Sequence, residues 1–165
     1  MAQFNPIKAQ AMKTNMTPEQ RERLTLEYGV LKKYAPSFRM LEVSSDMFVE
    51  GSVLASTGTQ YHARVMLPDS FPYDEPALLV ISPHPIWTRD HQQTVNSMGN
   101  SHAFHTKGAD ANGFLKLCAF GFWNPSFPIA KVVLKFCVWV EAYENYLKTS
   151  ETIADFLERK EGSGT

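Results

Sequence analysis

The residue best suited to covalent chemistry in this chain is Cys118. A polar loop precedes its segment, and a glycine and aromatic stretch at 120–123 follows it. This setting favours a place near a surface edge, where a free thiol is a chemical liability unless it is used. The sequence therefore predicts that Cys118 is a nucleophile. The alternative is a small buried apolar residue, which describes Cys137 well, because Cys137 lies inside an apolar helical segment.

Polar side chains that could assist Cys118 lie in the loop before it and in the turn after it. His102 or His105 could act as a base, and His105 or Asn124 could donate a hydrogen bond to an oxyanion. The two histidines and Cys118 also supply three zinc ligands. No fourth ligand and no Cys-x-x-Cys pair is evident, so we predict no metal site and no cofactor. The alternative to a zinc site is a solvated loop that carries histidines.

The element that opens the domain is a helix that begins at Thr17. Thr17, Pro18 and Gln20 have the types and spacing of a capping box with proline in the first turn. Pro36 ends the helix, because the residue before a proline disfavours helical geometry. An apolar stripe at helical spacing faces a sheet, and its members are Leu24, Tyr28, Leu31 and Ala35.

Four strands are predicted after this helix, at residues 38–43, 48–55, 61–67 and 77–81. A hairpin turn at 56–59 joins the second strand to the third, and the third alternates apolar and polar residues. A proline-spaced segment at 67–76 leads into the fourth. Because the connections are too short for crossover helices, we expect an antiparallel meander.

The rest of the domain is predicted to be a loop followed by helices. Residues 87–113 are polar and show no period, as functional loops often do. A long helix follows at 129–146, and Ser150 is expected to cap a short last helix. The fold class is α+β: an N-terminal helix, a four-stranded antiparallel meander and C-terminal helices. The expected domain spans 17–158, between a flexible N-terminal arm at 1–16 and a flexible tail at 159–165.

Composition narrows the classes of function. A formal net charge of −1 argues against a nucleic-acid binder held by phosphate contacts. Two cysteines in 165 residues are too few for a disulfide scaffold, which indicates a reducing, cytoplasmic compartment. The most apolar stretch, 129–140, carries Lys131 and Lys135 and is too short to span a bilayer. We therefore expect no membrane association.

Taken in order, these features resemble the ubiquitin-conjugating enzyme family. In that family a helix leads into a four-stranded meander, a proline-containing segment, a long loop, an active-site cysteine, a Trp-x-Pro and a long helix. The residues here that carry the resemblance are 61–68, 71–76, Cys118, 123–125 and 129–134. The resemblance covers residues 17–157. It implies that Cys118 forms a thioester with an activated C-terminal glycine carbonyl. An amine, usually that of a lysine, then accepts the acyl group from the cysteine.

One departure from the family concerns the oxyanion donor. Eukaryotic members carry a His-Pro-Asn triplet before the cysteine, and here residues 105–107 come nearest to it. The segments 26–34 and 139–146 are similar to the conjugating enzymes of bacterial anti-phage systems that use cyclic oligonucleotides. The resemblance thus implies a bacterial enzyme whose partner is a cyclic-oligonucleotide synthase. Conjugation would prime this synthase for anti-phage defence. Such a system is expected with or without a separate activating enzyme.

Two other functions compete with the conjugating enzyme. The first is a catalytically inactive binding module of the same fold, which would explain the missing triplet. The second is a thiol hydrolase that uses Cys118 with His102 or His105.

Overall fold

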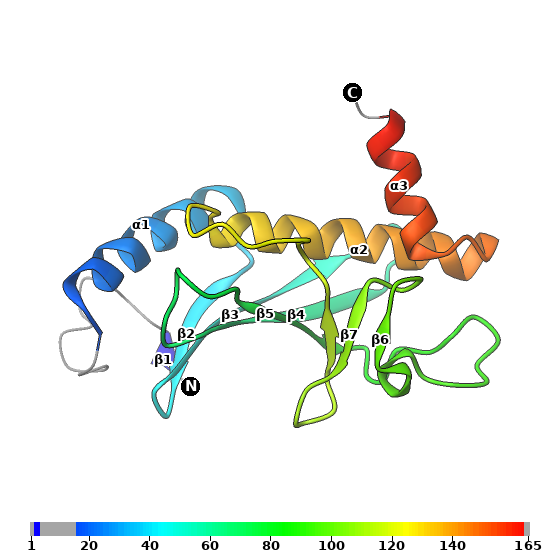
Figure 1. Cartoon of the computed structure of the whole chain (residues 1–165), viewed down its shortest axis with the longest axis horizontal. Coiled ribbons are helices and arrows are strands. Elements are labelled where there is room, and N and C mark those ends of the chain that lie inside the picture. Colours follow the sequence, from blue (N-terminus) through cyan, green and yellow to red (C-terminus); the bar gives the residue numbers. More distant parts are fainter. Residues whose placement is uncertain (1, 4–15, 164–165) are drawn as a thin grey trace.

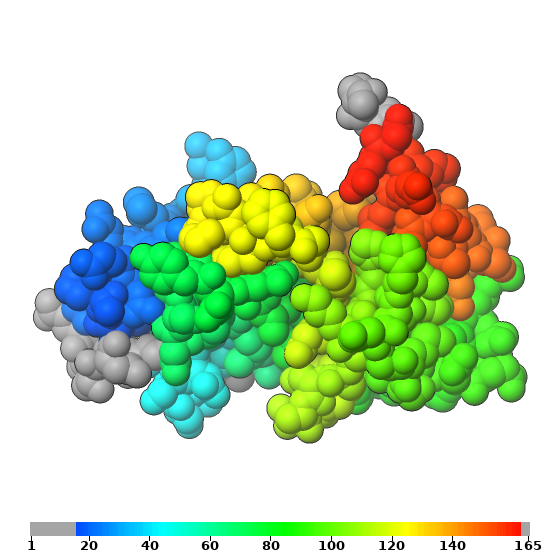
Figure 2. Space-filling model, viewed as in Figure 1, coloured from blue at the N-terminus to red at the C-terminus, as the bar shows by residue number. Residues whose placement is uncertain are grey.

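The structure, a computed structural model, describes residues 2–3 and 16–163 and has an α+β architecture. Helix α2 (Ile129–Thr149) runs along one face of a sheet, and α1 (Pro18–Tyr34) lies at one end of that layer (Figure 1). Helix α3 (Ile153–Ser163) leaves the far end of α2 and projects from the body. The surface is recessed between α3, shown in red, and the yellow segment that precedes α2 (Figure 2).

The sheet is antiparallel and follows the order β1-β2-β3-β4-β5-β8-β7-β6. The strands β2 to β5 confirm the predicted four-stranded meander. The predicted number of strands was wrong, since eight form within the described residues. Three of the additional strands come after β5 and have two to four residues each, which is too short for a period to be visible in the sequence. The strands are β1 (Ala2–Gln3), β2 (Arg39–Val43), β3 (Asp46–Leu54), β4 (Gln60–Leu67), β5 (Ala77–Ser82), β6 (Asn100–Ser101), β7 (Thr106–Ala109) and β8 (Leu115–Leu117).

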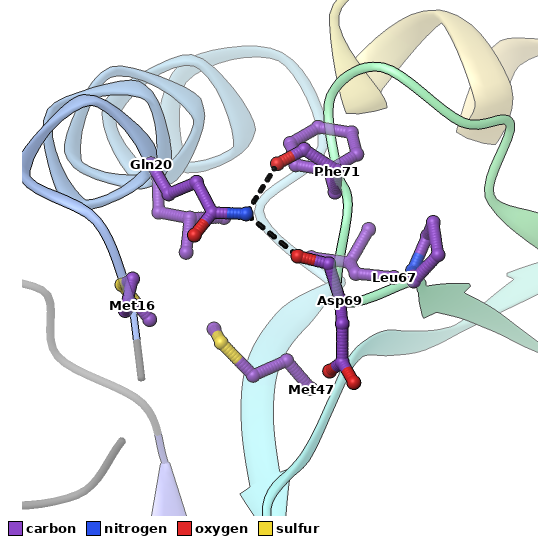
Figure 3. Close-up of a pocket in the computed structure, with 8 residues that line it drawn as sticks. Met16, Gln20, Met47, Leu67, Asp69 and Phe71 are labelled. Atoms are coloured by element: carbon purple, nitrogen blue, oxygen red, sulfur yellow. Dashed lines mark hydrogen bonds between the residues drawn. The ribbon is translucent and has the colours of Figure 1, made fainter. Parts of the chain in front are cut away.

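The start of α1 confirms the predicted capping box. The backbone N–H of Gln20 donates to Thr17 Oγ1 over 3.1 Å, and the N–H of Thr17 donates to Gln20 Oε1 over 3.0 Å. The same Gln20 side chain reaches across to the proline-spaced segment, where its Nε2 donates to the backbone oxygens of Asp69 and Phe71 (Figure 3). One residue therefore caps α1 and fixes the helix against the chain that follows β4.

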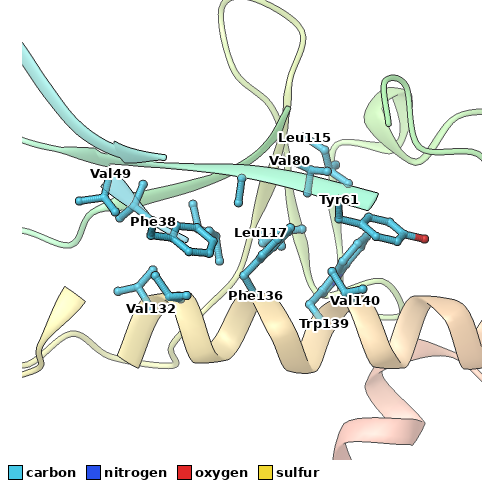
Figure 4. Close-up of a cluster of buried hydrophobic side chains, with 14 of the residues drawn as sticks. Phe38, Val49, Tyr61, Val80, Leu115, Leu117, Val132, Phe136, Trp139 and Val140 are labelled. Atoms are coloured by element: carbon cyan, nitrogen blue, oxygen red, sulfur yellow. The ribbon is translucent and has the colours of Figure 1, made fainter. Parts of the chain in front are cut away.

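The core lies between α2 and the sheet face that α2 covers (Figure 4). Phe136 and Val132 of α2 are fully buried and point toward the sheet, whose Val49 and Val80 belong to the same buried cluster (Figure 4). Alternation along β4 is as predicted, with Tyr61 and the apolar residues at every second position buried. Each such side chain contributes about 1.5–3 kcal/mol by leaving water, so this layer dominates the stability of the fold.

The chain ends differ from the prediction in two ways. Ser150 does not cap the last helix: it adopts a left-handed φ of 69° at the end of α2, and Thr152 Oγ1 accepts from the N–H of Asp155 instead. Helix α3 continues to Ser163, past the expected domain end at 158. Within the expected N-terminal arm, residues 2–3 form β1 and pair with β2, while residues 1 and 4–15 lie outside the described residues.

Among the described residues, no helix is both long enough and apolar enough to cross a bilayer.

Candidate functional site

Cys118 lies at the end of strand β8, immediately after Leu117. Its backbone N–H donates to the carbonyl oxygen of His105 over 2.9 Å, which continues the pairing of β8 with β7 by one step. The side chain is partly exposed, and its sulfur lies 3.8 Å from the carbonyl oxygen of Phe120. The thiol therefore lies at a strand end and is partly exposed, in keeping with the predicted place near the surface.

An open groove of about 770 Å³ contains Cys118. The sheet contributes Leu117 beside the cysteine, and the segment after β8 contributes three aromatic rings. Helices α2 and α3 form the opposite side, where Lys135, Lys160 and Glu161 supply charge. The apolar members from the later segments are Ala119, Phe120, Phe122, Phe127, Leu134, Val138, Trp139 and Leu157. The groove is thus mostly apolar and carries a few charged groups along α2 and α3.

His105 lines the same groove as Cys118, and its ring lies 5.8 Å from the ring of His102, centroid to centroid. Burial lowers the pKa of His105, the charge of His102 lowers it further, and hydrogen bonding to the backbone of Cys118 works in the opposite direction. The His105 imidazole is therefore neutral at pH 7 and able to accept a proton. His102 is exposed and is not part of the groove lining.

Asn124 lies outside the groove lining, in the turn that enters α2. Its Oδ1 accepts from the backbone N–H of Ser126 over 2.8 Å and from the Ser126 hydroxyl over 2.7 Å. An amide that bonds its own backbone two residues ahead stabilises a turn. The structure thus gives Asn124 a local structural role and brings His105, among the predicted assisting residues, to the cysteine's groove.

Trp123 anchors the segment that forms the aromatic side of the groove. Its Nε1 donates to the carbonyl oxygen of Pro72 over 2.7 Å, and its ring contacts those of Phe120 and Phe127. The proline-spaced segment and the Trp-x-Pro segment, which are distant in sequence, are joined by this bond. Trp123 is therefore an aromatic anchor for this segment.

Arg23 of α1 holds the same segment from the other side. Its guanidinium donates to the carbonyl oxygens of Pro125 and Phe127 over 2.6 and 2.8 Å, and its Nε donates to Glu27. Neither Arg23 nor Glu27 stood out in the sequence as part of the site. Their spacing of four residues in a helix predicts an ion pair. No residue near them in the sequence indicated that the arginine also reaches the chain before α2.

Metal chemistry has no candidate site among the described residues, since no group of three or more His, Cys, Asp or Glu side chains is placed to hold an ion. The His102, His105 and Cys118 set is thus not arranged as a zinc site. Cys137 lines a different groove, with Glu144 and Arg159, and burial raises the pKa of its thiol. Cys137 packs against the core, as predicted, but is partly rather than fully buried.

A second hollow lies where α1 begins, between Met16, Met47 and Asp69 (Figure 3). Its volume of about 30 Å³ is far smaller than the volume of about 770 Å³ of the groove at Cys118. The groove at Cys118 is therefore the better candidate for a binding site.

Comparisons with protein-family models, with curated proteins and with solved structures give no match for this chain.

Proposed function

We propose that Cys118 carries an acyl group as a thioester. The observation that supports this most directly is a partly exposed thiol on the end of a strand, inside an open groove of about 770 Å³. A groove of this kind fits an extended peptide tail, and an enclosed active site for a small molecule would be expected to bury the thiol more deeply. The fold supports the same role, because the meander β2 to β5 and the long helix α2 are the elements that the resemblance requires.

The proposed reaction has two steps. The Cys118 thiolate attacks the activated carbonyl at the C-terminus of a protein tail, and the leaving group departs with the electron pair of the bond that breaks. An amine then attacks the thioester, the carbon–sulfur bond breaks, and the thiolate is restored. Neutral His105 is placed on the groove to accept the proton that the amine loses.

The partner belongs to the same proposal. The resemblance assigns the tail to a cyclic-oligonucleotide synthase, with a terminal glycine or a similar small residue.

A peptide thioester tests the acyl-carrier role without an activating enzyme. A short peptide that ends in glycine, supplied as its mercaptoethanesulfonate thioester, should exchange onto Cys118 and release mercaptoethanesulfonate. Intact mass spectrometry should show one added peptide, which dithiothreitol removes. Cys118→Ala should show no adduct at this position, and Cys118→Ser should give an ester that resists the reductant.

Two controls separate a built site from ordinary thiol reactivity. Cys137→Ala should keep the adduct, since that thiol lies in another groove. The same reaction in urea measures the intrinsic rate of an unfolded thiol. A folded rate that does not exceed the rate in urea would contradict the proposal.

The groove also supports a second candidate, a thiol hydrolase, because His105 and Cys118 line it together. A hydrolase would release free peptide acid with turnover and leave little adduct, whereas a carrier would accumulate the adduct until an amine is added. Chromatography of the peptide products in the same reaction distinguishes the two functions.

A further inference from the structure

The groove at Cys118 carries an uneven distribution of charge. Lys131 and Lys135 lie four residues apart on α2, and each places its ammonium group against an aromatic ring of the groove segment: Lys131 lies 3.9 Å from the Phe127 centroid and Lys135 lies 5.6 Å from that of Phe120. Within the part of the chain that the structure describes, no carboxylate lies within ion-pair distance of either lysine.

The α3 end of the groove is different, because its charges are balanced locally. Lys160 lies 3.9 Å from a carboxylate oxygen of Glu141, and Glu161 lines the groove beside it. The positive field is therefore concentrated over the aromatic segment and the first turns of α2. Lys135 lines the groove and Lys131 lies four residues before it on α2, against Phe127, so a ligand over the aromatic segment meets a positive field, whereas Glu161 supplies negative charge from α3.

The same part of the groove exposes large apolar side chains. Phe122 is 71% exposed and Leu134 is 59% exposed, and both line the groove. Exposed apolar residues that gather beside a cleft are typical of interaction surfaces. A partner that covers them needs apolar side chains of its own, as well as charge that complements the lysines.

We infer that this groove selects a peptide tail that is apolar and acidic, rather than a basic one, through Lys131 and Lys135. The inference rests on the proposed function, because the occupant is the tail that delivers its C-terminus to Cys118. The acidic side chains would lie a few residues before the terminus, over α2, while the apolar ones cover Phe122 and Leu134. Complementary charge of this kind acts mainly on the rate of encounter and weakens with added salt.

Two peptide thioesters that differ only in charge test the inference. Both end in glycine as mercaptoethanesulfonate thioesters, and two positions upstream of the terminus are Glu in one and Lys in the other. At low salt the acidic peptide should form the Cys118 adduct about three- to tenfold faster, as expected for exposed ion pairs. The ratio should approach one in high salt.

Charge variants of the protein should change this ratio in defined ways. The double variant Lys131→Gln with Lys135→Gln should bring the ratio close to one, and Lys131→Glu with Lys135→Glu should invert it. Lys148→Glu is the matched control, because it lies on the same helix but lines the other groove, and it should leave the ratio unchanged. Equal rates for the two peptides on the wild-type protein at low salt would overturn the inference while leaving the acyl-carrier proposal intact.

A binding measurement keeps the two proposals separate. Fluorescence anisotropy with the same peptides as labelled carboxamides, on Cys118→Ala protein, reports occupation of the groove without chemistry. If neither thioester forms an adduct but the acidic carboxamide binds more tightly, the acyl-carrier proposal fails and the selectivity stands. If the two carboxamides bind equally, the selectivity fails whatever the thiol does.

Discussion

The carboxylate of Glu27, in α1, accepts a hydrogen bond of 2.9 Å from the backbone N–H of Ile129, the first residue of α2. Pro128 occupies the N-cap position of α2, and no side chain at that position caps the helix. The first N–H groups of a helix need acceptors, and a negative charge is favourable beside them. Glu27 therefore caps α2 from another helix, which fixes the point where the groove segment ends.

Replacing Glu27 tests this contact. Glu27→Ala should lower the free energy of unfolding by about 1–3 kcal/mol, because it leaves a buried N–H without its acceptor. Glu27→Gln keeps an acceptor oxygen and should lose less. Urea denaturation monitored by circular dichroism measures both. Glu22→Ala, an exposed change on the same helix, serves as the control and should stay within about 0.5 kcal/mol of the wild type.

Arg23 couples α1 to the groove segment, so its loss should affect both stability and the thiol site. Arg23→Ala removes the bonds to Pro125 and Phe127 and should lower the free energy of unfolding by about 1–3 kcal/mol. It should also slow adduct formation at Cys118 under native conditions, because the aromatic side of the groove is no longer held. Arg23→Lys should not restore either property, since lysine lacks the forked donors. Wild-type adduct rates in Arg23→Ala would show that the groove segment is held without it.

The lowered pKa of His105 predicts a dependence of stability on pH. Because the folded pKa lies below the ordinary value of 6.5, the unfolded chain binds the proton more readily than the folded chain. The stability that this group contributes is therefore complete above pH 6.5 and is lost as pH falls below 6.5 and through the lower pKa of the folded state. The free energy of unfolding, measured at pH 7.5 and 5.5, should fall less in His105→Gln than in the wild type. Identical falls in the two proteins would count against the shift.

Glu144 is a buried carboxylate on α2 that accepts hydrogen bonds of 2.9 Å from the hydroxyls of Tyr61 and Thr57. Burial and the neighbouring Glu144 raise the pKa of Tyr61, so the phenol stays protonated and donates. Tyr61→Phe removes one of these donors and should cost about 1–3 kcal/mol of unfolding free energy. The double variant Tyr61→Phe with Glu144→Leu removes the buried charge as well, so its loss should fall short of the sum of the two single losses. Additive losses would indicate that the two side chains act independently.

Local patterns in the sequence were sufficient for much of the fold. The capping box at Thr17, the hairpin at 56–59, the alternation along β4 and the long apolar helix all depend on residues a few positions apart, and each is found in the structure. The partial exposure of Cys118 is also in keeping with what its neighbours in the sequence predicted. These features could be predicted because helical and strand spacings are set by backbone geometry within a short window.

What the sequence left open depends on contacts between distant residues. Glu27 and Ile129 are 102 positions apart, and their bond exists only because α1 packs beside the start of α2. The pairing of His105 with Cys118 likewise requires β7 and β8 to extend the sheet. Both strands are too short to show the two-residue alternation by which a strand is recognised in a sequence. That His105 lines the groove with Cys118, whereas His102 and Asn124 do not, was therefore decided by tertiary packing, because side chains meet in space according to how whole elements bury their apolar faces.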